Sequence, residues 1–151
     1  METSVNNKCR AFTSLEQSRK LAEILPLDSA DMRYGYISPY DFSDRMYGGG
    51  YDKVPYPKDF LKLCADFCEE DIYDGSLPCW SLSALLGVLE SEIDGEEGET
   101  YQLNIEKDGT WWNVWYREQY DEANPIETES TEDLIDACYE MIIRLNELKM
   151  L

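Results

Sequence analysis

The chain has 151 residues, of which 43% are hydrophobic and 13% aromatic, a composition that favours a folded domain over a disordered chain. Its 32 acidic and 13 basic side chains give a formal net charge of −19, which disfavours direct binding of nucleic acid or of an anionic membrane. It contains no histidine, which excludes histidine-based catalytic triads and histidine metal sites.

The first predicted element is a helix over residues 15–25. Ser14 and Gln17 have the spacing of a capping box, in which each side chain accepts a hydrogen bond from the backbone amide of the other residue. Pro26 ends the helix, because a proline ring cannot continue the helical hydrogen-bond ladder. Residues 1–13, which precede the helix, are expected to be disordered.

Residues 27–56 form a long Tyr- and Gly-rich connection without helical periodicity. A connection of this length is unusual within a compact domain, so it either serves function or contains a short strand, for which residues 33–37 are the candidate. Pro57 suits the first position of a second helix, which would run to about Tyr73.

A third helix is predicted after Pro78, with Ser81 as its N-cap. Leucines spaced i, i+3, i+4 and i+7 form its apolar face, and they are Leu82, Leu85, Leu86 and Leu89. Two acidic tracts follow. Residues 90–99 hold six acids and no base, and residues 118–136 hold eight acids and no base. Both tracts are expected to lie largely in loops.

Asp108-Gly109 lies between two alternating runs and predicts a β-hairpin over about residues 100–117, with these two residues as its loop. In that register Lys107 faces Thr110, and opposed residues share one face of the ribbon. The apolar face then comprises Tyr101, Leu103, Ile105, Trp112, Val114 and Tyr116. The other face comprises Gln102, Asn104, Glu106, Trp111, Asn113 and Trp115.

The last predicted element is a helix that begins with an S-x-x-D box at Ser130 and Asp133. Its apolar stripe consists of Leu134, Cys138, Met141, Ile142, Leu145 and Leu148. Because a hairpin alone is only marginally stable, a third strand is expected, from residues 27–56. The sequence therefore predicts a single α+β domain over residues 1–151, with a small antiparallel sheet packed against about four helices.

Several chemistries find no support in the sequence. No apolar run approaches the roughly 20 residues of a membrane span. The N-terminal segment has no signal-peptide core, so a cytoplasmic protein without membrane contact is expected. The five cysteines form no C-x-x-C pair, which predicts buried free thiols. The spacings of zinc, calcium and phosphate-binding motifs are absent, so neither a metal nor another cofactor is expected.

Trp111 and Trp115 are the main candidate for a binding site, since they stand on the polar face of the hairpin. In one interpretation the tyrosine-rich segment or another chain, including a second copy in a homodimer, covers the rings as a second core layer. In the other, the exposed rings bind a protein partner or stack on a sugar. The neighbouring candidates are Gln102, Asn104 and Asn113 on the same face, and Tyr40, Tyr47 and Tyr51 from the connection.

The acidic tracts also allow two interpretations. They are a solvated surface, or they imitate the phosphates of DNA and occupy a basic host protein. Paired carboxylates beside aromatic rings are also typical of glycosidases. Four residues are candidates for such a pair, but nothing in their spacing singles one out. They are Asp71, Asp74, Glu118 and Asp121.

Three stretches, "LPCWSLSALLGVLE", "YQLNIEKDGTWWNVWYRE" and "TEDLIDACYEMIIRLNE", resemble a set of small phage and mobile-element proteins of gut anaerobic bacteria, a set without an established activity. The resemblance covers mostly residues 77–148, and its shared positions are mainly packing residues. It implies a host-interacting accessory protein. We therefore expect a non-enzymatic module that binds another protein, with a DNA-mimic inhibitor of a basic host protein and a carbohydrate-binding or glycosidase protein as alternatives.

Overall fold

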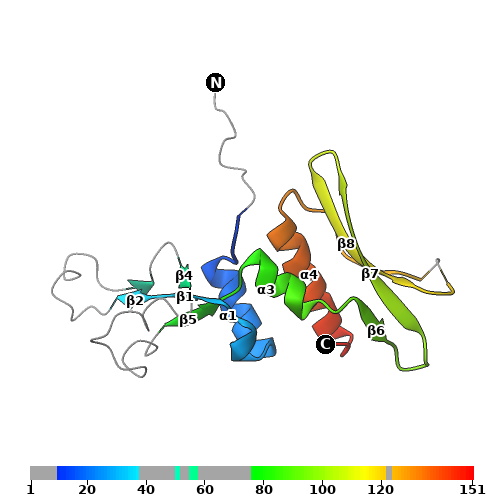
Figure 1. The fold of residues 1–151 in the computed structure, drawn as a ribbon, viewed down its shortest axis with the longest axis horizontal. Helices are drawn as coiled ribbons and strands as arrows, with labels where there is room; N and C mark the ends of the chain where they lie inside the picture. The colour runs from blue at the N-terminus through cyan, green and yellow to red at the C-terminus, as the bar shows by residue number, and fades with distance from the viewer. Residues whose placement is uncertain (1–9, 38–49, 52–54, 58–75, 122–123) are drawn as a thin grey trace. The chain divides into compact units, whose positions relative to one another are not determined.

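The computed structural model describes residues 10–37, 50–51, 55–57, 76–121 and 124–151. Backbone contacts divide the chain into two compact units, one of residues 14–81 and one of residues 1–13 together with 82–151. Each described part combines α-helix with antiparallel strands, so the predicted α+β class is confirmed (Figure 1). The first is the 14–81 unit, and the second, which includes residues 1–13, is the 82–151 unit.

The 14–81 unit begins with α1 (Leu15–Ile24), whose capping box is formed as predicted. The hydroxyl oxygen of Ser14 accepts from the amide of Gln17 at 3.1 Å, and the side-chain oxygen of Gln17 accepts from the amide of Ser14 at 3.0 Å. A 3-10 turn, η1 (Leu27–Ser29), follows Pro26. The two ends of the helix thus lie where the sequence predicts them, because both signals are local.

A three-stranded sheet forms the rest of this unit, in the order β4 (Tyr56–Pro57), β1 (Met32–Tyr34), β5 (Leu77–Cys79). A separate pair joins β2 (Tyr36–Ile37) to β3 (Gly50–Tyr51). The connection over residues 27–56 therefore does contain strands, but none of them extends the hairpin sheet. The expected single sheet was wrong, because β1 pairs with segments that show no strand pattern of their own.

Pro57 lies in β4 and not at the first position of a helix, and Pro78 lies in β5. Both strands are at the edges of their sheet, where a residue without an N–H group leaves no inter-strand hydrogen bond unmade. The rest of the predicted second helix, residues 58–73, lies outside the described residues. Ser81, the expected N-cap of the third helix, donates its hydroxyl to Asp31 at 2.5 Å.

Trp80 is the largest fully buried side chain in the described part of the 14–81 unit. Its indole N–H donates to the hydroxyl oxygen of Ser29 at 2.9 Å. The same segment is fixed by Asp31, which accepts from the amide of Ser81 at 2.9 Å. Cys79, beside Trp80 in sequence, is a buried free thiol, as predicted.

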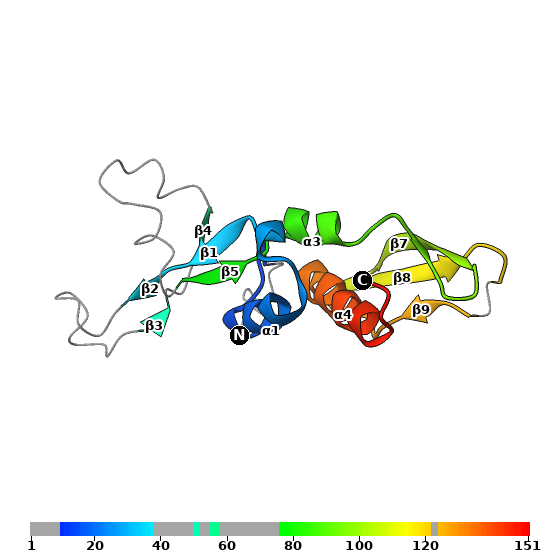
Figure 2. The same ribbon diagram turned by 90° about the horizontal axis from the view of Figure 1, so that it is seen from below.

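The 82–151 unit holds a four-stranded antiparallel sheet and two helices (Figures 1 and 2). The sheet order is β6 (Glu92–Asp94), β7 (Thr100–Asp108), β8 (Trp111–Glu118), β9 (Ile126–Glu127). The helices are α3 (Leu82–Val88) and α4 (Leu134–Glu147); α4 packs on β8, and α3 packs on α4. The described residues thus form three α-helices, where about four were expected.

The hairpin of β7 and β8 is confirmed, but its loop is displaced by one residue. Asp108 pairs with Trp111, so the loop is Gly109-Thr110 and not Asp108-Gly109. Gly109 has a φ of +62°, and Thr110 is not among the residues of positive φ, which is the pattern of a type II′ turn. Each residue of β7 therefore pairs two residues further along β8 than predicted. A shift of two preserves the alternation, so both predicted faces survive.

The apolar face of the hairpin packs against α4. Its buried members are Tyr101, Val114 and Tyr116, and β9 adds Ile126. The buried side of α4 consists of Ile135, Ala137, Cys138, Met141, Ile142 and Leu145. Towards the turn, the apolar face of the hairpin extends beyond the part that α4 covers. Trp112 is half-buried there with the ammonium of Lys107 at 5.2 Å from its ring centroid, and Ile105 is 39% exposed.

Asp133 alone is the N-cap of α4, since its carboxylate accepts from the amide of Ile135 at 2.8 Å. The predicted box was wrong at Ser130, which instead donates its hydroxyl to the side-chain oxygen of Asn113. Arg10 forms ion pairs with Asp133 and Asp136 at the start of the helix. Residues 10–13 are therefore held in the fold, contrary to the expected disorder, and residues 1–9 lie outside the described residues.

The hairpin loop allows a paired stability test. Alanine at Gly109 would meet no atom within 4 Å but must adopt a positive φ, so Gly109→Ala is expected to lower the free energy of unfolding by about 1–2 kcal/mol. Gly87 lies in α3, and an added methyl group there would also meet no atom within 4 Å. Gly87→Ala is therefore expected to raise the free energy of unfolding by about 0.5–1 kcal/mol. Urea unfolding of both variants measures the difference, and equal shifts would contradict the assigned turn.

Candidate functional site

The polar face of the hairpin is the candidate site, since α4 packs on the opposite face of the sheet. Trp115 lies in the middle of β8, directly between Asn104 on β7 and Glu127 on β9. Trp111 lies at the turn opposite Asp108 and is 48% exposed. The two tryptophans thus stand on one side of the same strand, which confirms that they share a face apart from Trp112.

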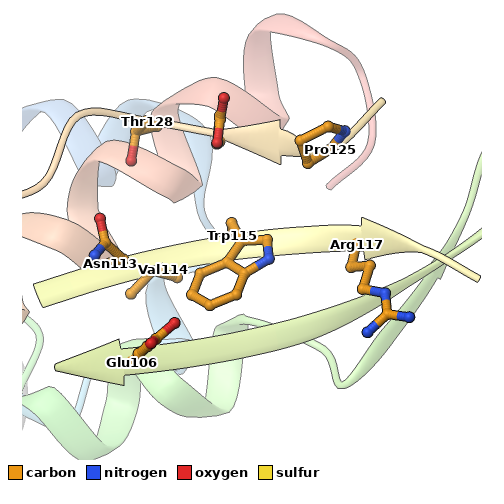
Figure 3. Close-up of a pocket in the computed structure, with 8 residues that line it drawn as sticks. Glu106, Asn113, Val114, Trp115, Arg117, Pro125 and Thr128 are labelled. Carbon is orange, nitrogen blue, oxygen red and sulfur yellow. The ribbon is translucent and has the colours of Figure 1, made fainter. Parts of the chain in front are cut away.

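A hollow of about 380 Å³ opens beside the half-buried ring of Trp115 (Figure 3). Figure 3 shows the ring lying along β8 between Glu106 of β7 and the β9 segment that carries Pro125 and Thr128. The hollow is lined by Glu106, Asn113, Val114, Trp115, Arg117, Pro125, Glu127 and Thr128. An aromatic ring, two carboxylates and one guanidinium therefore share a single concave surface.

A break in strand pairing forms one wall of this hollow. Tyr116 pairs with Ile126 and Trp115 with Glu127, but Trp112 pairs with Thr131. Three residues, 128–130, thus stand opposite two residues of β8, which is the mark of a β-bulge. Hydrogen bonds of 2.6 and 3.1 Å between the backbones of Trp112 and Thr131 close the far end. Thr128, the first residue of the bulge, lines the hollow.

The polar residues on this face are held by hydrogen bonds. The side-chain nitrogen of Asn104 donates to the carbonyl of Gln102 at 3.0 Å, and that of Gln102 donates to Glu92 of β6 at 3.3 Å. Ser130 holds Asn113 from the bulge. These bonds restrain the side chains around Trp115, so less rotamer entropy is lost when a ligand contacts them.

Like charges crowd at the other end of the hairpin, where the two acidic tracts meet. Partial loss of hydration raises the pKa of Glu118, and the neighbouring carboxylates of Asp121 and Glu99 raise it further. Burial raises the pKa of Tyr101 in the same region, with Glu118 as the next cause. Acidic side chains of both tracts therefore lie on or beside the sheet, because each tract contributes a strand to it.

The structure brings five of the eight predicted site residues together on one face: Trp111, Trp115, Asn113, Gln102 and Asn104. Tyr51 lies in β3 of the 14–81 unit. Tyr40 and Tyr47 lie outside the described residues. A contribution of these three tyrosines to the same surface stays a prediction.

Sequence reasoning missed the part of the hollow that comes from β9. Pro125, Glu127 and Thr128 fall in the second acidic tract, which was expected to be a loop. The prediction of loops was wrong for β6 and β9, which are short edge strands. The available signal was a single apolar residue in each, Ile93 between two acids and Ile126 between Pro125 and Glu127, both of which are buried.

Comparison with protein-family models, with curated proteins and with solved structures finds no match for this chain. Within the described residues, no three His, Cys, Asp or Glu side chains gather in an arrangement that would hold a metal ion. None of the helices described combines the length and the apolar character that a bilayer crossing requires.

Proposed function

We propose that this chain is a non-enzymatic accessory protein of the phage and mobile-element type, which acts by binding another protein. Its binding surface is the polar face of the hairpin, with Trp111 and Trp115 as the aromatic anchors and with Gln102, Asn104 and Asn113 around them. Large rings that are partly exposed on a restrained scaffold are the residues that most often dominate protein interfaces.

The observation that carries this proposal is the position of the two rings. Trp111 is 48% exposed, and Trp115 lines a hollow on the face of the sheet that α4 leaves open. A core tryptophan would be expected to lie under a helix, as Tyr116 does on the other face. The acidic surroundings favour a basic partner, since a net charge of −19 repels acidic proteins.

The experiment is affinity capture from bacterial host lysate with Trp111→Ser/Trp115→Ser, beside Ile105→Ser as the matched control. The double variant is expected to lose capture of the partner by at least about thirtyfold, because even one hot-spot tryptophan contributes about 2 kcal/mol or more. Ile105→Ser removes an exposed apolar side chain from the opposite face and should keep capture. Circular dichroism checks that both variants fold.

Two results would contradict the proposal. Unfolding of the double variant would show that the rings are core, and undiminished capture would show that they are not anchors.

A DNA mimic, the alternative in which the carboxylates themselves carry binding, has one supporting observation: β6 and β9 hold acidic side chains on strands. In that case Glu92→Gln/Asp94→Asn would abolish capture and the tryptophan variant would not.

A further inference from the structure

We infer that the hollow beside Trp115 receives an arginine side chain of the protein partner, with the guanidinium lying on the indole ring between Glu106 and Glu127. This inference rests on the proposed function and specifies the chemistry that the partner presents. It follows from three features of the described residues: the position of the two carboxylates, the open side of the ring and the sign of the charge.

The two carboxylates stand on opposite sides of Trp115. Glu127 is its direct partner on β9, and Glu106 is the partner of Asn113 on β7, one diagonal position from the ring. Neighbouring strands are about 4.8 Å apart and two residues along a strand span about 7 Å, so the backbones that carry Glu106 and Glu127 are separated by roughly 12 Å on a diagonal across β8. That width admits one planar group over the ring, with a carboxylate within reach at each side.

The ring offers the surface that a guanidinium prefers. A cation over the face of tryptophan is attracted by the ring quadrupole, and arginine stacks more readily than lysine because its charge is planar and less strongly hydrated. Carboxylates then accept the N–H groups at the edge of the guanidinium. Asn113, restrained by Ser130, closes the site towards the turn.

The charge of the lining favours a cation over other ligands. It contains two carboxylates and a single base, Arg117, whose side chain stands at the end of the ring away from Glu106 (Figure 3). An anionic ligand would meet the field of both carboxylates and of the acidic tracts beyond them. A neutral sugar would stack on the ring and donate hydroxyl groups to the carboxylates, but it would bring no positive charge to offset theirs.

The test is titration of the full chain with N-acetyl-arginine amide, followed by nuclear magnetic resonance of the four indole N–H groups. The Trp115 signal is assigned with Trp115→Phe. Addition of the arginine compound should move this signal in a saturable manner. N-acetyl-citrulline amide, which has nearly the same shape without the charge, should leave it unmoved at the same concentration.

Paired variants separate this site from the general acidic field. Glu106→Gln/Glu127→Gln should weaken binding of the arginine compound by roughly three- to tenfold, in line with two partly exposed charge contacts. Glu96→Gln/Glu97→Gln makes the same change in net charge in the loop between β6 and β7 and should weaken binding of the arginine compound less than about twofold, because distant surface charges are screened by salt.

Four results would overturn the inference: no shift of the Trp115 signal with the arginine compound, equal binding of the citrulline compound, equal weakening by both pairs of variants, or a saturable shift of the Trp115 signal with maltotriose in place of arginine. Its failure is distinct from failure of the proposed function. If the arginine compound leaves Trp115 unmoved but Trp111→Ser/Trp115→Ser still abolishes capture, the binding face stands and its occupant is not arginine. If capture survives the tryptophan substitutions, the binding face itself is wrong.

Discussion

Trp80→Ala is expected to lower the free energy of unfolding by about 3–5 kcal/mol, the cost of removing a fully buried aromatic side chain. Trp80 has no exposed surface, and its indole N–H is satisfied by Ser29 at 2.9 Å. The substitution removes the apolar contacts of the ring and leaves a cavity that neighbouring side chains fill only in part. Urea unfolding followed by far-ultraviolet circular dichroism measures the loss.

Two variants divide this loss into its parts. Trp80→Phe keeps most of the buried apolar area and is expected to cost less than Trp80→Ala. Ser29→Ala keeps the ring but deprives the buried indole N–H of its acceptor, at an expected cost of about 1–3 kcal/mol. A loss below about 1 kcal/mol in Trp80→Ala would show that the ring does not belong to a packed core.

Alkaline pH is expected to destabilise the 82–151 unit between about pH 9 and pH 12. Tyr116 and Cys138 are both buried between β8 and α4. Burial raises the pKa of Cys138 from 9.0 to about 12, and Asp133 adds to the shift. Burial likewise raises the pKa of Tyr116 from 10.0 to about 12, followed by the charges of Glu90 and Cys138. Both groups therefore remain neutral in the folded protein while they ionise in the unfolded chain.

The direction of the effect follows from these values. At about pH 8 and below the two groups are protonated in both states, and their contribution to stability is fully present. As pH rises towards 12, the unfolded chain releases its protons first, so the free energy of unfolding falls. Each unit of difference between the folded and the unfolded pKa corresponds to about 1.4 kcal/mol of unfolding free energy. Because the two titrations are coupled, their effects do not simply add, and a combined loss on the order of 3–5 kcal/mol is expected.

Urea unfolding at a series of pH values from 8 to 12 measures this loss. The control is Tyr116→Phe/Cys138→Ala, which removes both ionisable groups and should flatten the dependence on pH, although it is less stable at pH 8. Part of that lower stability comes from the hydrogen bond that the Tyr116 hydroxyl donates to the carbonyl of Glu90 at 2.7 Å. An unchanged slope in the double variant would place the alkaline transition elsewhere.

The features that the sequence predicted correctly depend on residues close together in the chain. The capping box of Ser14 and Gln17 lies within the first turn of the helix, and the two faces of the hairpin follow from alternation alone. The prediction of the two faces was unaffected by the error in the position of the loop. The sequence D-G-T allows either Asp108-Gly109 or Gly109-Thr110 as the loop, and the two choices differ in register by two residues, which keeps every side chain on its side of the sheet.

The features that the sequence failed to predict depend on distant partners. β5, β6 and β9 have three, three and two residues, too few to show a period, and they are strands only because β1, β7 and β8 offer backbone groups to pair with. Proline in β4 and β5 further obscured the pattern. The hollow beside Trp115 was missed for the same reason, since its outer wall belongs to β9 and to the bulge that follows.

The short outer strands of the four-stranded sheet bear on how copies of this protein behave at high concentration. β6 exposes Glu92 and Asp94, and β9 exposes Glu127. If the edge strands of two molecules lay side by side, their carboxylates would face one another. Such repulsion between edge strands is a known protection against strand addition into fibrils. Negative charge along both outer strands thus opposes polymerisation of crowded molecules through these strands.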